Sequence, residues 1–331
     1  MSGESGPVPA AAGVPPLRLS AGPAHAGLRA EAFLALELPF LSRSRIRQKI
    51  QTGESLLNGR RFATSARIRE GDEILVAWRS APDRRPAPAL PVLSEDDFLI
   101  AVDKPAGVAS HPGGGRQSGT VVQFLCQRFE ADVRSSLQAG GDFFPRLVNR
   151  LDFFTSGIIV AAKTGSALRA LHALSASHRV EKVYAALVEG VVERDEGTIN
   201  LPLGPDPDST TAVKMAVRPD GAPCVTEYRV ERRLAGCTLL SIRPLTGRQH
   251  QIRAHCAAIG HPVWGDLLYK DERLFLRWRA NGGALDYSLP PRHCLHAGHC
   301  SFDHPVTGRR VSIHSPIPAD FAEIVSRYPG L

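Results

Sequence analysis

The sequence predicts an α+β protein in which a small N-terminal domain precedes a larger one. Three observations support this prediction: a basic helix pattern followed by turn-rich strand patterns, a proline-rich interruption, and a long C-terminal stretch of apolar strand patterns containing one well-delimited helix. We expect four parts, which are a disordered tail (1–25), a small domain (26–78), a linker (79–92) and a large domain (93–331).

The N-terminal tail is rich in Pro, Ala and Gly, a composition that does not build a packed core. Its start lacks Lys and Arg, which argues against a secretory signal peptide. No apolar run approaches the length of a membrane span. The six cysteines have no disulfide spacing, which is typical of a reducing compartment. We therefore expect a cytoplasmic protein with no membrane association, and a monomer.

The small domain should begin with a short basic helix. Ser42 is a good N-cap, Ile46 and Ile50 repeat at i, i+4, and Gly53 is a natural stop. Two turn signals follow, Asn58-Gly59 and Gly71-Asp72, each beside a short alternating stretch. A helix followed by hairpin-like strands is therefore predicted for residues 42–78.

The net charge of +7 and the pI of about 9.3 favour a polyanionic partner, most simply nucleic acid. The charge is concentrated: residues 43–61 hold six positive side chains and one acid, Glu54. The six are Arg43, Arg45, Arg47, Lys49, Arg60 and Arg61. Cations this close repel one another unless an anionic partner neutralises them, so we expect them to bind RNA. A solvated basic helix without a partner is the alternative.

The linker is defined by Pro82, Pro86, Pro88 and Pro91. Proline at this density resists the interiors of helices and sheets and produces a semi-rigid, extended chain. The large domain then begins with DFLIAVDKP (97–105), which reads as a strand ended by proline. The glycine-rich residues 106–115 can approach a phosphate backbone, but no Walker lysine follows them, and local patterns favour a structural turn.

Three further segments of the large domain have clear patterns. GIIVAAKT (157–164) is apolar and β-branched, as in a strand buried on both faces. VEKVYAALVEG (180–190) alternates and places Lys182 and Tyr184 on one face. LTGRQHQIRAHCAAIGHPVWGDLLY (245–269) predicts a helix with a capping box formed by Thr246 and Gln249 and an end at Gly260 and Pro262.

A single carboxylate, Asp152, precedes the buried strand across a tight turn in VNRLDFFTSGIIVAAKT (148–164). The acid can simply cap that turn, where Thr155 and Ser156 also bond nearby backbone groups. It can equally be a functional group at the mouth of the strand. Arg253 on the predicted helix would need an acid if it were buried, and Asp152 is a candidate.

Five segments, taken in order, resemble the RluA-type pseudouridine synthase family. They are VDKPAGVASHP (102–112), NRLDFFTSGIIVAAKT (149–164), EKVYAALVEG (181–190), GRQHQIRAHCAAIGHPVWGDLLY (247–269) and LHAGHCSFDHPVTGRR (295–310). Residues 26–78 resemble the small S-four RNA-binding domain. The resemblance implies a mixed, mainly antiparallel sheet with an active cleft across its middle. It also implies isomerisation of specific uridines in structured RNA, with ribosomal RNA favoured and transfer RNA as the alternative.

The resemblance also implies roles for individual residues. Asp152 matches the family's essential aspartate, and Arg253 matches the arginine that pairs with it. Tyr184 matches the tyrosine that stacks on the target uracil and is thought to remove the proton from its 5-carbon. Arg150 matches an arginine that fills the space left by the flipped nucleotide.

The chain departs from the family pattern at four positions near these residues. Asn149 stands where the family has His, Gln249 where it usually has Thr, and Phe153 and Phe154 where it commonly has charged or polar residues. These changes bear on nucleotide flipping and substrate choice. Residues 271–292 lie outside the matched motifs, and we expect an insertion near the cleft that contacts RNA through Arg273, Arg277 and Arg279.

The implied reaction detaches uracil from its ribose, rotates it and rejoins it through carbon. Since water is not added and no redox change occurs, one carboxylate suffices, and neither metal nor cofactor is required. Whether the aspartate attacks the sugar, attacks the base or removes a ribose proton stays open. Other interpretations are a zinc site in HCLHAGHC (293–300), a non-catalytic RNA-binding factor, and a hydrolase that would need a second acid.

Overall fold

The computed structural model describes residues 16–38, 41, 43–77, 85–113, 118–139, 141–280 and 292–331. The chain divides into two compact units, each assembled from separate stretches of sequence. The first contains Met1–Ala89, Ala109–Leu147 and Ala162–Gly165, and the second contains Leu90–Val108, Val148–Ala161 and Ser166–Leu331. Residues 109–147 therefore group with the N-terminal part, although the predicted boundary assigns them to the large domain.

The first unit contains a small antiparallel sheet. Its strand order is β1–β3–β2, with β1 at Leu17–Ser20, β3 at Glu73–Val76 and β2 at Ser55–Leu57. Helices α1 (Ala30–Glu37) and α2 (Arg43–Gln51) share a core with it that includes Phe33, Ile46 and Ile74. The short helix predicted before Gly53 is confirmed as α2, while Ser42 lies outside the described residues. The unit also contains η1 (Pro23–His25), α3 (Val121–Arg128), α4 (Glu130–Gln138) and β6 (Phe143–Leu147).

The predicted disordered tail is wrong from residue 17 onward, because Leu17–Ser20 forms β1 and pairs with β3. Leu17 and Leu19 alternate with exposed neighbours and pack against the core, which explains why this stretch is ordered. Residues 1–15, and residues 79–84 of the predicted linker, lie outside the described residues. The rest of the linker has no helix or strand until β4 begins at Val92.

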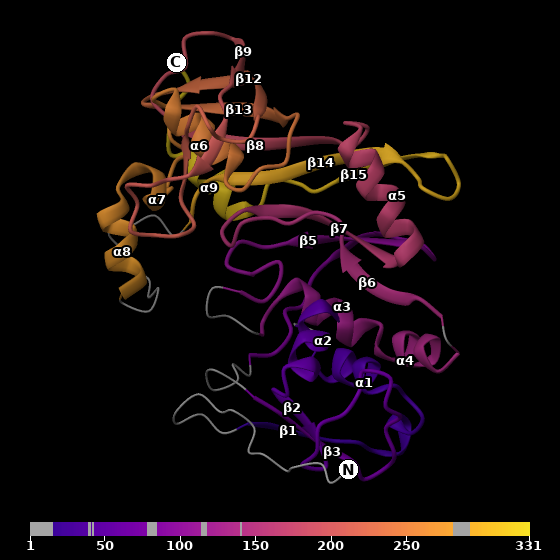
Figure 1. The fold of residues 1–331 in the computed structure, drawn as a ribbon. Helices are drawn as coiled ribbons and strands as arrows, with labels where there is room; N and C mark the ends of the chain where they lie inside the picture. The colour runs from indigo at the N-terminus through magenta and orange to yellow at the C-terminus, as the bar shows by residue number, and fades with distance from the viewer. Residues whose placement is uncertain are drawn as a thin grey trace. The chain divides into compact units, whose positions relative to one another are not determined.

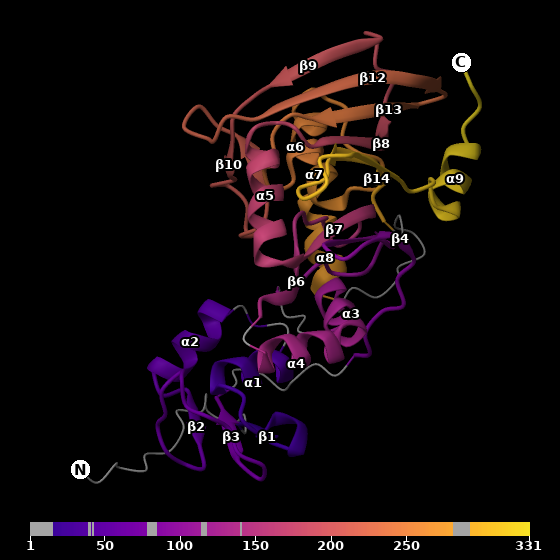
Figure 2. The same ribbon diagram turned by 90° about the vertical axis from the view of Figure 1, so that its right-hand side faces the viewer.

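The second unit is built on a mixed sheet in the order β4–β5–β7–β14–β8–β13–β12–β9, with β15 beside β14. The bounds are β4 Val92–Glu95, β5 Leu99–Lys104, β7 Ser156–Thr164, β14 Leu295–Asp303, β8 Glu181–Glu189, β13 Cys237–Pro244, β12 Val225–Leu234, β9 Glu196–Asn200 and β15 Arg310–His314. The β7–β14 pair is parallel, whereas β14–β8, β8–β13, β13–β12 and β12–β9 are antiparallel. The predicted mixed, mainly antiparallel sheet is confirmed. Figure 2 shows β9, β12, β13, β8 and β14 side by side.

Alternation along β8 divides its side chains between two cores, one on each face of the sheet. Ala186 and Val188 pack with Ile252 and Cys256 of α6 (Gln251–Ala258). On the other face, Leu187 packs with α9 (Ala319–Ser326). Tyr184 lies on the α6 face, which confirms the alternation predicted for this strand.

The remaining elements of the second unit are short. They are α5 (Gly165–Ala176), α7 (Leu267–Lys270), α8 (Glu272–Ala280) and the hairpin of β10 (Leu203–Pro205) and β11 (Met215–Val217). Strands distant in sequence lie together, as where β14 runs between β7 and β8 (Figure 1). Of the helices in the described ranges, none is long and apolar enough to cross a membrane.

Candidate active site

Asp152 lies in the tight turn that leads into β7. The backbone N–H of Thr155 donates to the Asp152 carbonyl (3.1 Å), which closes the turn. The next carbonyl, that of Phe153, accepts from Gly107 N (2.9 Å) and from Lys104 Nζ (3.2 Å). Lys104 is fully buried and also donates to the carbonyls of Pro105 and Val108, so one cation ties the loop after β5 to the Asp152 turn.

The start of β7 is fixed by side chains from the segment before and within β14. Thr155 Oγ1 hydrogen-bonds His293 Nε2 (2.8 Å), and Ser156 Oγ bonds His296 Nδ1 (2.9 Å) and accepts from Arg292 Nη2 (2.8 Å). All five of these residues are buried. The position of Asp152 is therefore determined by a bonded network and not by a free loop.

Gly157 brings β7 and β14 together at this point. Its φ of +112° is one that residues with a side chain rarely adopt, and a Cβ there would lie 2.3 Å from the carbonyl oxygen of Ala297. Only glycine allows the two backbones to approach this closely, immediately beyond the Asp152 turn.

Arg253 joins two acids. Its Nη1 donates to Asp152 Oδ2 (2.9 Å), while Nε and Nη2 form a bidentate pair with Asp266 (2.6 and 2.8 Å). The Arg253 side chain is 8% exposed and that of Asp266 is 1% exposed, so this pair is held out of water. The planar, forked guanidinium suits such a double contact, which a lysine does not reproduce.

The charges around Asp152 keep its carboxyl ionised. Burial would raise the pKa of Asp152, but Arg253 and the hydrogen bond it donates outweigh burial, and the pKa lies below its usual value. The Asp152 side chain remains 28% exposed. Among the described residues, only Oδ2 accepts a hydrogen bond, so Oδ1 is available to a bound molecule.

Tyr184 presents an aromatic ring on the same face of the sheet as α6, where it packs against the buried cluster around Ile252 and Leu295. Burial, and then the neighbouring Cys300 and Asp152, raise the pKa of its hydroxyl. The phenol is therefore protonated at neutral pH and can stack on a base as an uncharged ring.

His250 and Tyr269 complete the surroundings of Asp152. His250 Nε2 lies 3.9 Å from Asp152 Oδ1, and its Nδ1 lies 3.1 Å from Tyr269 Oη. The Tyr269 ring lies under the Arg253 guanidinium, 5.0 Å from centroid to Cζ. Burial, and then Arg253, lower the pKa of His250 to about 4, so this imidazole is neutral at physiological pH.

The predicted pair of Asp152 and Arg253 is thus brought together, but four neighbours were missed by the sequence analysis: Asp266, Tyr269, His250 and His293. Asp266 and Tyr269 lie in the quoted GDLLY, where an acid after glycine in an otherwise apolar run was the available signal. Their spatial relation to Arg253 depends on the turn between α6 and α7, which no local pattern specifies.

The predicted capping box of Thr246 and Gln249 is wrong. Helix α6 begins at Gln251, with His250 as its N-cap in a left-handed conformation. The first helical residue, Gln251, makes the contact to Thr246 instead. Its Oε1 accepts from Thr246 Oγ1 (2.9 Å) and from Arg248 N (3.0 Å). Gln249 points elsewhere and donates to the Val213 carbonyl (2.9 Å).

The departures from the family pattern have defined surroundings. Asn149 donates to the Ile158 carbonyl (3.1 Å) and accepts from Val160 N (2.8 Å), which is a structural role beside β7. Phe154 contacts Trp278 of α8 (ring centroids 5.4 Å apart), so the unusual Phe-Phe pair meets this helix two residues beyond Asp152. Arg150, Arg273, Arg277 and Arg279 are exposed; residues 281–291 lie outside the described residues.

The basic residues of the first unit fall into different environments. Arg45, Arg47, Arg60 and Arg61 are exposed, and Arg47 pairs with Glu31 (3.0 Å). Lys49 does not fit its predicted RNA-binding role, because it is buried and its ammonium donates to Glu54 (2.7 Å) and to the Ala77 carbonyl (2.9 Å). Nothing is described of the Arg43 side chain.

The histidines of HCLHAGHC bond to protein groups: His293 and His296 hold β7, and His299 bonds Ser312 (3.0 Å). Within the described ranges, no group of three or more His, Cys, Asp or Glu side chains is arranged to hold a metal ion.

Known proteins that resemble this chain belong to one family. Residues 98–258 match the model of the family described as RNA pseudouridylate synthase. The ribosomal large subunit pseudouridine synthase D of Xanthomonas campestris pv. campestris is 35% identical over 304 residues, which cover 91% of this chain and 89% of that protein. The protein of the same name from Nitrosomonas europaea is 35% identical over 311 residues, covering 92% of this chain and 86% of that protein.

The fold has a solved counterpart in human RNA pseudouridylate synthase domain containing 1. That structure is 23% identical, has a TM-score of 0.53, and the match covers 75% of this chain and 91% of the human chain. The fold and the matched motifs therefore define an RNA-modifying isomerase. The chain belongs to the RNA pseudouridylate synthase family, whose members convert uridine in RNA into pseudouridine.

Proposed function

We propose that this enzyme modifies uridine in ribosomal RNA, with Asp152 as the catalytic carboxylate. The names of the Xanthomonas and Nitrosomonas relatives favour ribosomal over transfer RNA. The observation that carries the catalytic assignment is the state of Asp152: ionised, with Oδ2 held by Arg253 and Oδ1 left available.

The chemistry explains why one available carboxylate oxygen is enough. Breaking the glycosidic bond leaves positive character on the ribose, which an adjacent carboxylate stabilises or bonds. The detached uracil itself returns as the nucleophile, so no second acid has to activate water. Asp266 is close, but both its oxygens are bound by Arg253. This arrangement argues against a hydrolase, which needs a second working acid.

Tyr184 is proposed to stack on the flipped uracil. Its raised pKa argues against a phenolate at neutral pH, so the ring serves first as an uncharged platform. Arg253 is proposed to keep Asp152 ionised and aimed. Neither role calls for a cofactor, because the reaction is an isomerisation.

The RNA surface is proposed to include the S-four-type domain of residues 26–78, which would supply binding energy to offset the cost of flipping the target base. Arg45, Arg47, Arg60 and Arg61 are the exposed candidates on this domain, and Arg150 is the candidate beside Asp152. We further propose a cytoplasmic monomer.

The test is to map pseudouridine by carbodiimide-based sequencing in cells that lack the gene and are rescued by wild type, Asp152→Asn or Asp220→Asn. Asp220 is a matched control, because it is an exposed acid paired with Arg218. We expect discrete ribosomal RNA sites to be restored by wild type and Asp220→Asn only. Restoration by Asp152→Asn would refute the catalytic assignment, and sites confined to transfer RNA would refute the substrate assignment.

A further inference from the structure

His250 occupies a left-handed backbone position beside the free oxygen of Asp152. Its φ of 53° and ψ of 17° are uncommon values for residues with a side chain, although Asn, Asp and His adopt them more often than the others. The side chain is 11% exposed. The backbone therefore tolerates histidine here, and it is the burial of its imidazole beside Asp152 that calls for an explanation.

Tyr269 fixes the orientation and the tautomer of that imidazole. Tyr269 Oη accepts a hydrogen bond from Met215 N (3.0 Å), which leaves its own hydrogen to be donated. Among the described residues, its one acceptor is His250 Nδ1 at 3.1 Å. The hydrogen of the neutral imidazole is therefore on Nε2, the nitrogen that faces Asp152.

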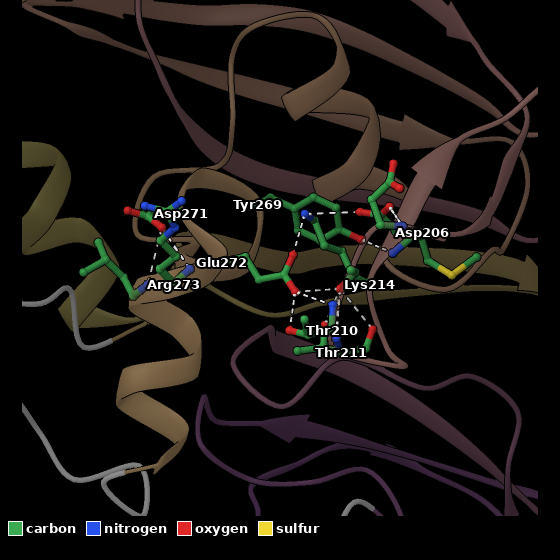
Figure 3. A network of polar contacts seen from close by, with 12 residues as sticks. Asp206, Thr210, Thr211, Lys214, Tyr269, Asp271, Glu272 and Arg273 are labelled. Atoms are coloured by element: carbon green, nitrogen blue, oxygen red, sulfur yellow. Dashed lines mark hydrogen bonds and ion pairs between the residues drawn. The ribbon is translucent and has the colours of Figure 1, made fainter.

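The support of Tyr269 extends to a polar clamp between α8 and the β10–β11 hairpin. Figure 3 shows Tyr269 beside Lys214 and Glu272, which are paired at 2.9 Å. The same Glu272 carboxylate accepts from Ser209 Oγ (2.8 Å) and Thr210 N (3.0 Å). Because Met215 directly follows Lys214, this clamp fixes the N–H that bonds Tyr269, and through Tyr269 it fixes His250.

His250 Nε2 and Asp152 Oδ1 can contact neighbouring atoms of one bound molecule. At 3.9 Å the two groups are too far apart to hydrogen-bond each other. An acceptor atom can therefore bind the Nε2–H while an adjacent electron-deficient carbon lies against Oδ1. The groups that face His250 are Asp152, Arg253, Asp266, Tyr269 and His293, and none of them hydrogen-bonds Nε2.

We propose that His250 is a further catalytic residue, whose Nε2–H donates a hydrogen bond to the O2 carbonyl of the target uracil. This inference rests on the proposed function, since it assumes a uridine bound at Asp152. O2 is the carbonyl adjacent to the glycosidic nitrogen, so it lies next to the sugar carbon that Asp152 addresses. A neutral donor suits this position, because it adds no charge beside Arg253.

The hydrogen bond strengthens as the reaction proceeds. When the glycosidic bond breaks, its electron pair leaves with uracil and spreads over N1 and the carbonyl oxygens. The sugar carbon is left electron-deficient beside Asp152. His250 stabilises the charge on O2 without giving up its proton. When the 5-carbon bonds to the sugar carbon it loses its proton and N1 gains one, so the isomerisation leaves no net charge on the base. A donor aimed at developing charge in this way acts as an oxyanion hole does.

The first test compares His250→Gln with His250→Asn in the full chain. Gln can present an amide N–H near the position of Nε2, whereas Asn tolerates the left-handed backbone but is too short. On an RNA oligonucleotide carrying the mapped uridine, we expect His250→Asn to lower kcat about 10- to 100-fold with little change in KM. We expect His250→Gln to recover part of that loss, and His250→Asn to unfold at the same temperature as wild type or higher.

The second test identifies the acceptor atom with three RNA substrates that carry uridine, 2-thiouridine or 2′-deoxyuridine at the target position. Sulfur is a weak acceptor, so we expect 2-thiouridine to slow wild type while His250→Asn slows it no further. If the two losses multiply instead, O2 is not the acceptor and the proposal is overturned. Coupling to the 2′-deoxy substitution would overturn it in favour of a ribose contact.

Failure of this proposal is distinguishable from failure of the proposed function. If wild type forms no pseudouridine in any RNA, the proposed function has failed. If wild type is active and His250→Asn keeps its full kcat, only the role of His250 is refuted.

Discussion

Arginine is abundant in both units of the chain, but its surroundings differ sharply. Arg253 is buried and uses three nitrogens on two acids of its own chain. Arg45 and Arg60 of the small domain are exposed, and Arg45 donates to a neutral side chain of its own helix in the contact at 2.8 Å to Gln48 Oε1. We propose that the first kind of arginine holds catalytic groups in place, and that the second kind presents charge to RNA.

The largest effect is expected from Arg253→Lys. Lysine cannot bond both oxygens of Asp266 and also reach Asp152, so a buried charge loses a partner. We expect the free energy of unfolding to fall by about 3 kcal/mol and kcat by at least about 100-fold, measured by denaturation and by pseudouridine formation. Arg229→Lys, at an exposed site outside the proposed RNA surface, is the control and should change neither.

The acidic limb of the rate profile sharpens this prediction. Arg253 lowers the pKa of Asp152, so wild type should keep its activity down to pH values below the usual range of an aspartate. Loss of that support should move the acidic limb of kcat/KM to higher pH in Arg253→Lys. An unmoved limb would mean that Arg253 does not control the ionisation of Asp152.

Lys49→Met tests an exception within the basic helix. Lys49 is buried and bonded to Glu54 and Ala77, so it belongs with Arg253 in its physical behaviour. We expect a loss of about 1–2 kcal/mol in unfolding free energy and no change in RNA affinity. The hydrogen bond from Lys49 lowers the pKa of Glu54 in the folded protein. The stability lost in Lys49→Met should therefore be largest above the pKa of glutamate in the unfolded chain. It should shrink as the pH falls through the lower, folded-state pKa of Glu54. If Lys49→Met weakened RNA binding, Lys49 would have to be counted among the RNA-binding residues.

The double variant Arg45→Glu, Arg60→Glu tests the exposed kind of arginine. We expect RNA affinity to fall about tenfold at physiological salt, with a shallower salt dependence and an unchanged kcat at saturating RNA. The double variant Arg229→Glu, Arg243→Glu, at two exposed sites of the second unit, changes the net charge by the same amount and is the control. Equal losses in both variants would show that total charge, and not its position, governs binding.

The smallest effect concerns His250, a buried group kept uncharged beside Arg253. The pKa of His250 is lowered from its ordinary value of 6.5 to about 4 in the folded protein, so as the pH falls the unfolded chain takes up the proton first. Proton uptake by the unfolded chain lowers the free energy of unfolding progressively between pH 6.5 and 4. The free energy of unfolding of His250→Asn minus that of wild type, measured by urea denaturation, should be about 1 kcal/mol larger at pH 5.5 than at pH 7.5. An equal stability difference at both pH values would contradict the neutral imidazole.

Sequence reasoning reached the Asp152–Arg253 pair because burial of an arginine demands an acid, and the family motifs supplied both partners. It also found the buried strand β7, the alternation of β8 and the stop of α2 at Gly53, all of which follow from local periodicity and turn chemistry. These features depend on neighbours along the chain, which is why the pattern was sufficient.

The remaining features depend on tertiary contacts. Lys49 resembled its exposed neighbours in sequence, and only the approach of Ala77 and Glu54 removes it from solvent. Regular structure begins earlier than predicted because Leu17 and Leu19 pair with residues of β3, more than fifty residues away in the sequence. No local pattern distinguishes His250 from His255 and His261, yet those two bond backbone carbonyls while His250 faces Asp152.

The strand order has a consequence for the integrity of the enzyme. Asp152 precedes β7 and Tyr184 lies on β8, and these strands are separated by β14, which is laid between them from near the C-terminus. Neighbouring strands are about 4.8 Å apart, so one intervening strand sets a separation of about 10 Å between the two carriers. Gly157 allows the backbones of β7 and β14 to approach closely within that distance. We therefore expect a truncation before residue 295 to retain Asp152, Tyr184 and Arg253 in the chain and still lose pseudouridine formation, because β14 would no longer lie between β7 and β8.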